Sequence, residues 1–191
     1  MTHTLILPGL HDSDPEHWQS RWEAEAKNVH RVIQDNWVTP RCADWVSKLD
    51  QALAVRGPDA VLVAHSAGCA LVAHWAASRR QRRVRGALLV APSDPEAPSF
   101  PSDPIGFAPM PLQRFPFRSV VVASSNDPFV TVSRAQVFAR AWGSEFVMIG
   151  KAGHINSASA LGNWPQGLAL LRSLCESHNQ TEENLAAREE I

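Results

Sequence analysis

Residues 60–69, Ala-Val-Leu-Val-Ala-His-Ser-Ala-Gly-Cys, decide how the rest of this 191-residue chain is interpreted. Residues 60–64 form a continuous apolar run, which is typical of a strand buried on both faces of a sheet. Residues 67–78 are rich in small side chains and are expected to form a helix. Ser66 lies on the turn between them, and small residues two positions before and after it let the backbone bend sharply. Such a strand–turn–helix unit exposes the Ser66 hydroxyl at the carboxyl edge of the sheet.

The same alternation of strand and helix patterns extends in both directions from this segment. Further runs of strand length lie at residues 4–7, 30–34, 86–91, 119–123 and 145–149. Helical patterns lie at residues 16–27, 43–55, 132–142 and 165–176. Asp14 is a plausible N-cap of the first of these helices, with Pro15 at its first position. Six apolar strands that alternate with helices predict a doubly wound parallel sheet, a three-layer α/β/α fold.

Composition and charge limit the classes of protein to which the chain can belong. It has 18 Lys and Arg against 19 Asp and Glu, a net charge of −1, and 45% hydrophobic residues. This content is too apolar for a disordered chain, and near-neutrality gives no attraction to nucleic acid or to an acidic membrane. We expect a single domain over residues 1–177 and a polar, acidic tail over 178–191. We interpret the basic run at residues 79–85 as a solvated helix end, in preference to a binding site for an anionic partner.

The three cysteines, Cys42, Cys69 and Cys175, are far apart in the sequence and odd in number. They lack the close spacing of a zinc site, and free thiols in a reducing compartment are the better interpretation. The sequence shows no signal peptide and no apolar run long enough to span a bilayer. A cytoplasmic protein without a metal or other cofactor is therefore expected, and the sequence carries no signal for an oligomeric state.

Two further polar residues follow later strands and complete a recognisable set with Ser66. Asp127 comes just after the strand at 119–123, and His154 follows the strand at 145–149. Because the carboxyl ends of parallel strands share one edge, the three side chains are expected to converge. Their order, Ser-Asp-His, is that of the α/β-hydrolase triad. His154 would then act as the general base, and Asp127 would orient its ring.

Each of these residues also has a simpler interpretation when it is taken alone. Ser66 could be only a helix N-cap, Asp127 before a proline could be a turn residue, and His154 could be a loop histidine. The triad is favoured because three residues of the required types stand at three suitable strand ends in the required order. For the oxyanion hole, the backbone N–H of Ala67 is one expected donor. The N–H of Leu10, in the loop after the first strand, is the other.

The sequence resembles the small serine hydrolases of the YdeN type, a family that also includes a retinoblastoma-binding protein. The motifs that carry the resemblance are Leu7-Pro8-Gly9 with Glu16-His17-Trp18, Asp44-Trp45, Val63-Ala64-His65-Ser66-Ala67-Gly68, Ser125-Asn126-Asp127-Pro128 and Ala152-Gly153-His154-Ile155-Asn156. The resemblance implies a triad of Ser66, Asp127 and His154 on a minimal α/β-hydrolase fold. It also implies the strand order 2-1-3-4-5-6 and no large cap domain. Ala64 departs from the common glycine, which would matter only if it required a positive φ.

The substrate pocket is expected above Ser66, next to a long connection at residues 92–116 that contains eight prolines. Residues considered for the pocket are His11, Trp18, Trp37, Phe107 and Trp164. For Phe107 two roles are open, an apolar pocket wall or an anchor that fixes the connection to the core. Whether the connection acts as a lid is also open.

The hypothesis that fits these features best is a serine hydrolase that cleaves a small ester through an acyl-enzyme. Amide or peptide hydrolysis by the same triad is an alternative that sequence does not separate from it. A different class, a protein-interaction module on a hydrolase scaffold, is kept as a further alternative because the family has a protein-binding member. In either enzymatic case the expected partner is a small-molecule ester or amide, with no nucleic acid and no membrane.

Overall fold

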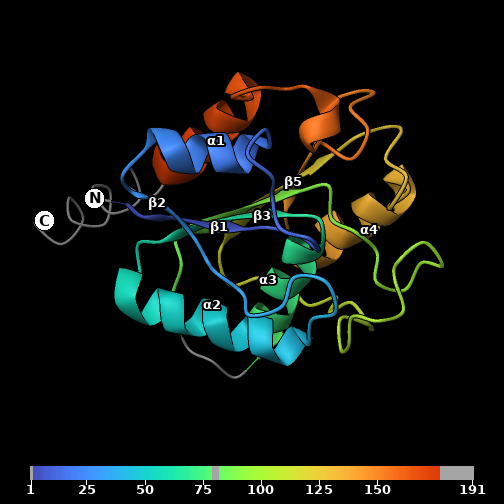
Figure 1. The fold of residues 1–191 in the computed structure, drawn as a ribbon, viewed down its shortest axis with the longest axis horizontal. Coiled ribbons are helices and arrows are strands. Elements are labelled where there is room, and N and C mark those ends of the chain that lie inside the picture. Colours follow the sequence, from blue (N-terminus) through green and yellow to red (C-terminus); the bar gives the residue numbers. More distant parts are fainter. Residues whose placement is uncertain (1, 79–81, 177–191) are drawn as a thin grey trace, which may run out of the picture.

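The computed structural model describes residues 2–78 and 82–176, which form a six-stranded parallel sheet between two layers of helices (Figure 1). The strands are β1 (Thr4–Leu7), β2 (Val29–Arg31), β3 (Val61–His65), β4 (Gly86–Val90), β5 (Arg118–Ala123) and β6 (Glu145–Met148). Their order in the sheet is β2-β1-β3-β4-β5-β6, as the family resemblance implied. The expected tail at 178–191, and residues 79–81 of the basic run, lie outside the described residues.

Helices cover both faces of this sheet. They are α1 (Trp18–Glu25), α2 (Cys42–Arg56), α3 (Ala67–Ala77) and α4 (Val132–Trp142), followed by the short 3-10 helix η1 (Ser157–Ser159) and a final helix over residues 165–176. In Figure 1, α1 and the final helix, drawn in red, lie together on one side of the sheet, whereas α2 and α3 lie on the other. The helix α4 packs on the same face as α2 and α3, because its apolar side chains share their core.

The central strand β3 shows why the sheet needs cover on both sides. All five of its residues are buried, and successive side chains point to opposite faces. Leu62 and Ala64 belong to the core under α2, α3 and α4, whereas Val61 and Val63 belong to the core under α1 and the final helix. The apolar run in the sequence is therefore continuous because alternate side chains of β3 face two separate cores.

Several element boundaries differ by one to three residues from those expected from the sequence, and the main differences are at α1 and β2. The helix α1 begins at Trp18 instead of residue 16, and its N-cap is His17, whose Nδ1 accepts the Gln19 N–H at 3.2 Å. Asp14 instead accepts the Glu16 N–H at 2.8 Å within the preceding turn. The strand β2 ends at Arg31, because its pairing with β1 ends there.

The long connection from β4 to β5 contains no helix or strand of its own, and no large cap domain is present within residues 2–78 and 82–176. It is fixed to the rest of the molecule at several points, including an isolated bridge between Arg41 and Ile105.

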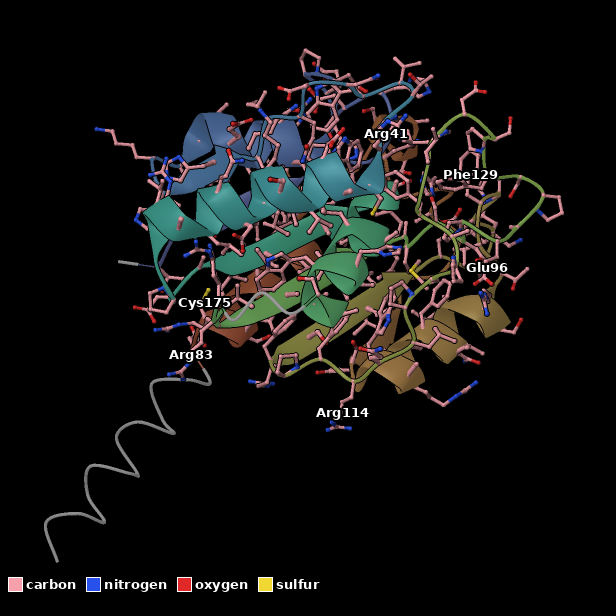
Figure 2. All side chains as sticks on the ribbon, turned by 90° about the horizontal axis from the view of Figure 1, so that it is seen from below. Arg41, Arg83, Glu96, Arg114, Phe129 and Cys175 are labelled. Carbon is pink, nitrogen blue, oxygen red and sulfur yellow. The ribbon has the colours of Figure 1, made fainter. Side chains whose placement is uncertain are left out.

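Figure 2 shows Arg41, Glu96 and Phe129 on one side of the molecule, and Arg83 and Cys175 on the opposite side. No helix in the described part of the chain is long and apolar enough to cross a membrane.

Candidate active site

Ser66 occupies a strained turn between β3 and α3. Its φ of 56° and ψ of −123° lie outside the regions that L-residues favour, and this strain is typical of a nucleophile elbow. The Ser66 N–H donates to the carbonyl of Val90 at 3.0 Å, which ties the turn to the end of β4. Ala64 lies inside β3 and is not among the residues with positive φ, so the alanine found there in place of glycine causes no strain.

Two glycines allow the turn to pack against the end of β1. A Cβ on Gly68 would lie 2.2 Å from the carbonyl oxygen of Leu7, a distance that no side chain tolerates. A Cβ on Gly9 would lie 2.7 Å from the Cβ of Ser66. The loop after β1 and the turn after β3 are therefore in close contact, and Leu10 is held next to Ser66.

The side chains of Ser66, His154 and Asp127 form a continuous line of hydrogen bonds at the carboxyl edge of the sheet. His154 Nε2 lies 2.9 Å from Ser66 Oγ, and His154 Nδ1 lies 3.0 Å from both carboxylate oxygens of Asp127. Because a carboxylate can only accept, Nδ1 carries the proton of the neutral ring and Nε2 accepts from the Ser66 hydroxyl. The Asp127 side chain is fully buried. The three residues predicted to converge therefore lie in hydrogen-bonding contact.

The loops that carry Asp127 and His154 are held together by the side chains of Ser124 and Asn126, for which no role was predicted from the sequence. Ser124 Oγ accepts the Ala152 N–H at 2.9 Å, and Asn126 Oδ1 accepts the Gly153 N–H at 2.9 Å. The Ser124 hydroxyl also donates to Asn126 at 2.8 Å. Ser124 directly follows β5 and Asn126 lies two residues further along, at the same sheet edge as the candidate triad. This position after a strand could have indicated their role.

A row of three histidine rings lies behind the candidate nucleophile. The ring of His65 is 4.8 Å from that of His154 and 4.7 Å from that of His17, measured between centroids. His65 Nε2 donates to the backbone carbonyl of His154 at 2.8 Å. Burial lowers the pKa of His17 to about 4 and holds the pKa of His65 well below its usual value, so both rings are neutral at pH 7.

Phe129 closes the other side of the His154 ring. The two rings meet edge to face at a centroid distance of 4.6 Å, and the Phe129 N–H donates to Asp127 at 2.9 Å. Through these contacts Phe129 helps to orient both the carboxylate and the imidazole. Within residues 2–78 and 82–176, no group of three or more His, Cys, Asp or Glu side chains is placed to hold a metal ion.

A cavity of about 300 Å³ opens above Ser66. Its walls come from the loop after β1, the connection after β4 and the loops that carry the candidate triad. The lining residues are Gly9, Leu10, His11, Asp12, Asp14, His17, His65, Ser66, Ser93, Ser99, Phe100, Pro101, Phe129, His154 and Asn156. His11, considered for the pocket from the sequence, is among them.

Trp18 and Trp164 do not line this cavity. Both are almost completely buried in the core between the sheet and α1, where their rings meet at a centroid distance of 4.9 Å. The Trp18 indole N–H donates to the carbonyl of Ile155 at 2.8 Å, directly after His154. The interpretation of these two residues as pocket walls was wrong. Both stand beside loops in the sequence, but their rings turn away from the cavity and pack in the core.

Trp37 and Phe107 are likewise absent from the lining residues, and both pack around Trp45 of α2. The Trp45 ring is 5.5 Å from that of Trp37 and 5.4 Å from that of Phe107. Phe107 is 1% exposed, so it anchors the connection to the core, the second of the two roles left open above. The carbonyl of Trp37 accepts the His11 N–H at 2.8 Å, which links Trp37 to the loop after β1.

The two expected oxyanion donors differ in their position relative to the cavity, because Ala67 is 1% exposed and is not among the lining residues. Leu10 lines the cavity, and Ala67 is the first residue of α3, so its N–H has no acceptor within the helix. Among the described residues, neither the Leu10 N–H nor the Ala67 N–H has a backbone acceptor.

Ser93, for which no role was predicted from the sequence, also contacts the candidate nucleophile. Its Oγ lies 2.7 Å from Ser66 Oγ. Ser93 follows β4 at the carboxyl edge of the sheet, and this position after a strand could have indicated its contact with Ser66. Pairing of β4 with β3 explains why residues 66 and 93 meet although 27 positions separate them.

Comparison with known proteins identifies the family to which the chain belongs. The sequence profile of the serine hydrolase family matches residues 4–173. The chain belongs to the serine hydrolase family. A search of curated proteins found no match.

Solved structures that resemble this serine hydrolase include two YdeN-type proteins. A protein described as a YdeN-like hydrolase from Pectobacterium atrosepticum is 34% identical, with a TM-score of 0.81 over 92% of this chain and 91% of that one. The ydeN gene product of Bacillus subtilis is 18% identical, with a TM-score of 0.73 over 91% and 98%. A thermophilic esterase from Thermogutta terrifontis is 17% identical, with a TM-score of 0.63 over 91% and 90%. The YdeN resemblance found in the sequence is confirmed, and the α/β-hydrolase fold with it.

Proposed function

We propose that this serine hydrolase cleaves a small carboxylic ester through an acyl-enzyme formed on Ser66. The observation that carries the proposal is the line of hydrogen bonds from Ser66 Oγ through the His154 ring to Asp127, at the floor of a cavity of about 300 Å³. A nucleophile, a base and a group that orients the base are the parts that acyl transfer by serine requires.

In the acylation half, Ser66 Oγ attacks the ester carbonyl carbon while its proton passes to His154 Nε2. The new Oγ–C bond turns the carbonyl oxygen into an oxyanion, and the N–H groups of Leu10 and Ala67 are the proposed donors that stabilise it. The imidazolium gives its proton to the alkoxy oxygen as the C–O bond breaks and the alcohol leaves. Asp127 keeps Nδ1 protonated throughout and stabilises the cation.

In the deacylation half, a water molecule takes the place of the alcohol. His154 Nε2 removes one proton from the water as its oxygen attacks the acyl carbon. The second tetrahedral intermediate collapses, the bond from carbon to Ser66 Oγ breaks, and Oγ recovers its proton from His154. The carboxylic acid is released and the resting enzyme is restored.

The cavity walls favour a short and uncharged or cationic substrate. The volume of the cavity, about 300 Å³, is near the lower end of the usual range of about 300 to 1,000 Å³ for small-molecule sites. Asp12 and Asp14 are among the lining residues, and no Lys or Arg is. The charge of Asp12 is offset by the Arg31 guanidinium at 2.6 Å, so the negative charge of the wall depends on Asp14. The Ser157 hydroxyl donates to Asp14 and lowers the pKa of this carboxyl, which keeps its negative charge in place. An acidic substrate would therefore be repelled.

A fluorophosphonate probe together with an ester panel tests the proposal. Wild-type protein is expected to be labelled at Ser66 and to hydrolyse p-nitrophenyl acetate faster than long-chain esters, whereas Ser66→Ala is expected to do neither. Absence of labelling on the wild-type protein would overturn the proposal. Faster release from matched amides than from esters would favour the amide alternative. Capture of a protein partner by Ser66→Ala, without turnover of any ester or amide by the wild type, would favour the interaction module.

The proposed setting is the cytoplasm, as expected from the sequence. The support is the state of Cys42, Cys69 and Cys175, which are all free thiols. Burial raises the pKa of Cys42 to about 12, so this thiol stays protonated and unreactive. Structural thiols of this kind are common in reducing compartments.

A further inference from the structure

Ser93 is a second hydroxyl in direct contact with the atom that is proposed to attack the substrate. Its Oγ lies 2.7 Å from Ser66 Oγ, while His154 Nε2 lies 2.9 Å from the same atom. Ser93 is 5% exposed and lines the cavity above Ser66. Ser66 Oγ therefore has two polar partners in the resting enzyme, and the triad accounts for only one of them.

The direction of the two hydrogen bonds follows from the number of protons available. His154 Nδ1 faces the Asp127 carboxylate and carries the ring proton, so Nε2 has none and must accept. The single proton of the Ser66 hydroxyl is used in that bond. The short contact with Ser93 is then a hydrogen bond only if the Ser93 hydroxyl donates to Ser66 Oγ.

The backbone around Ser93 is fixed from both sides, so this hydroxyl is held where it is. Ala91, two residues before Ser93, has a φ of 47°, and its N–H donates to the carbonyl of Val122 at 2.8 Å. The following Asp94 binds the guanidinium of Arg134 in α4 at 2.9 and 3.2 Å. The Arg134 guanidinium also contacts Glu96 at 2.5 Å, so the first residues of the 92–116 connection are anchored to α4.

We propose that Ser93 is a fourth catalytic residue, a hydrogen-bond donor to the nucleophilic oxygen of Ser66; this inference rests on the proposed function. As the Ser66 proton passes to His154 during attack, negative charge develops on Oγ, and a hydrogen bond to a charged oxygen is about twice as strong as one between neutral groups. The Ser93 hydroxyl keeps its own proton in this step. It strengthens its bond in the transition state more than in the ground state, which is the condition for acceleration.

The bond is expected to weaken again in the acyl-enzyme, where Ser66 Oγ is an ester oxygen and a poor acceptor. It strengthens once more as Oγ leaves the second tetrahedral intermediate with negative charge. Ser93 would therefore assist both halves of the reaction. It differs from the oxyanion donors Leu10 and Ala67, which act on the carbonyl oxygen of the substrate.

The test compares the rate of fluorophosphonate labelling at Ser66 in the wild type, Ser93→Ala and Ser93→Cys. Alanine removes the hydroxyl donor. Cysteine is similar in size to serine, but its thiol is only a weak hydrogen-bond donor. Both variants are expected to react about 10- to 100-fold more slowly, the effect of losing a hydrogen bond to a charged group. Ser102→Ala, at an exposed position of the same connection outside the cavity lining, is the matched control and is expected to keep the wild-type rate.

The dependence of labelling on pH separates a direct role from a structural one. Because the contact of His154 with Asp127 is untouched, both Ser93 variants are expected to keep the wild-type midpoint and to lose only the plateau rate. Rates are compared at a temperature where thermal melting shows every variant to be folded.

Labelling of either Ser93 variant at the wild-type rate or faster would overturn the inference. A shifted pH midpoint would also overturn it, because Ser93 would then act by keeping His154 in place. In both cases labelling of the wild type would leave the proposed function standing. A wild-type protein that is not labelled would instead remove the proposed function itself.

Discussion

Gly9 and Ser66 approach so closely that the missing side chain of Gly9 is a condition for the geometry of the site. A Cβ on Gly9 would lie 2.7 Å from Ser66 Cβ and 3.1 Å from Ser66 Oγ. Contacts this short are not tolerated, so either the turn at Ser66 or the loop that carries Leu10 would have to move. The proposed nucleophile and a proposed oxyanion donor are thus brought together by one contact between two loops.

Gly9→Ala is therefore expected to lower kcat on p-nitrophenyl acetate by about 10²–10³, the usual loss when one oxyanion donor is removed. Gly57→Ala is the control. Gly57 has a φ of 80°, a ψ of 179° and open space around it, so alanine there is expected to cost about 1–3 kcal/mol of stability without changing kcat. Wild-type turnover by Gly9→Ala would show that the loop after β1 does not contribute to the oxyanion hole.

Asp127→Asn tests the orienting role proposed for the buried carboxylate. An amide retains the shape of the side chain but can present an N–H to Nδ1 of His154, which favours the wrong tautomer. The expected loss in kcat is about 10⁴, with little change in KM. Asp103→Asn, at an exposed position of the 92–116 connection, is expected to behave as the wild type. A loss of less than tenfold in Asp127→Asn would contradict this role.

Ser124→Ala tests the link between the loops that carry Asp127 and His154. The variant loses a bond to the Ala152 N–H and another to Asn126, in a residue that is 1% exposed. We expect a loss of about 1–3 kcal/mol in the free energy of unfolding, the cost of buried polar groups without partners, and a lower kcat. The neighbouring Ser125→Ala, at an exposed position, should change neither quantity. Urea unfolding and ester kinetics on the same samples give both readouts.

The sequence was sufficient to predict the sheet, its parallel strands and the convergence of Ser66, Asp127 and His154. Each of these depends on a local pattern: apolar runs of strand length, small residues around a turn, and polar residues directly after strands. Parallel topology then brings those strand ends to one edge, so no long-range information was needed.

The orientation of the aromatic residues could not be predicted in the same way. Trp18 and Trp164 stand next to loops, yet both rings turn into the core beneath α1. Trp37 and Phe107 pack around Trp45, a contact between segments far apart in the sequence. Whether a large side chain beside a loop faces a cavity or the core depends on the space left by the other elements. Single-sequence patterns do not contain that information.

The contact between Ser93 and Ser66 was missed for a related reason. A serine after a strand is common and carries no distinctive motif, and its meaning depends on the register between β3 and β4. That register places residue 65 opposite residue 90, which brings the segments that follow both strands side by side.

The buried histidines predict a specific dependence of stability on pH. Burial lowers the pKa of His17 to about 4 in the folded protein, whereas it is about 6.5 in the unfolded chain. Between these values the unfolded state binds a proton that the folded state does not, so stability falls as the pH is lowered from 6.5 to 4. A shift of this size corresponds to about 3 kcal/mol. Above pH 6.5 the contribution is constant.

His17→Asn is the matched variant for this prediction. Asparagine does not titrate in this range and can still cap α1 through its side-chain oxygen. Urea unfolding between pH 7 and 4.5 should show a shallower loss of stability than in the wild type, with the remaining slope due to His65 and other groups. An unchanged slope would mean that His17 is not held neutral by burial.

Trp18→Phe distinguishes the core role of Trp18 from the pocket role that its sequence position suggested. Phenylalanine retains most of the packing but removes the indole N–H, which leaves the Ile155 carbonyl without its 2.8 Å partner. We expect a loss of about 1–3 kcal/mol in stability from this buried acceptor and an unchanged KM for p-nitrophenyl acetate. Phe100→Ala provides the contrast, because Phe100 lines the cavity and its removal should raise KM. A raised KM in Trp18→Phe with unchanged stability would return Trp18 to the pocket. A loss of stability with a lower kcat at constant KM would instead show that Trp18 supports catalysis by fixing the residue that follows His154.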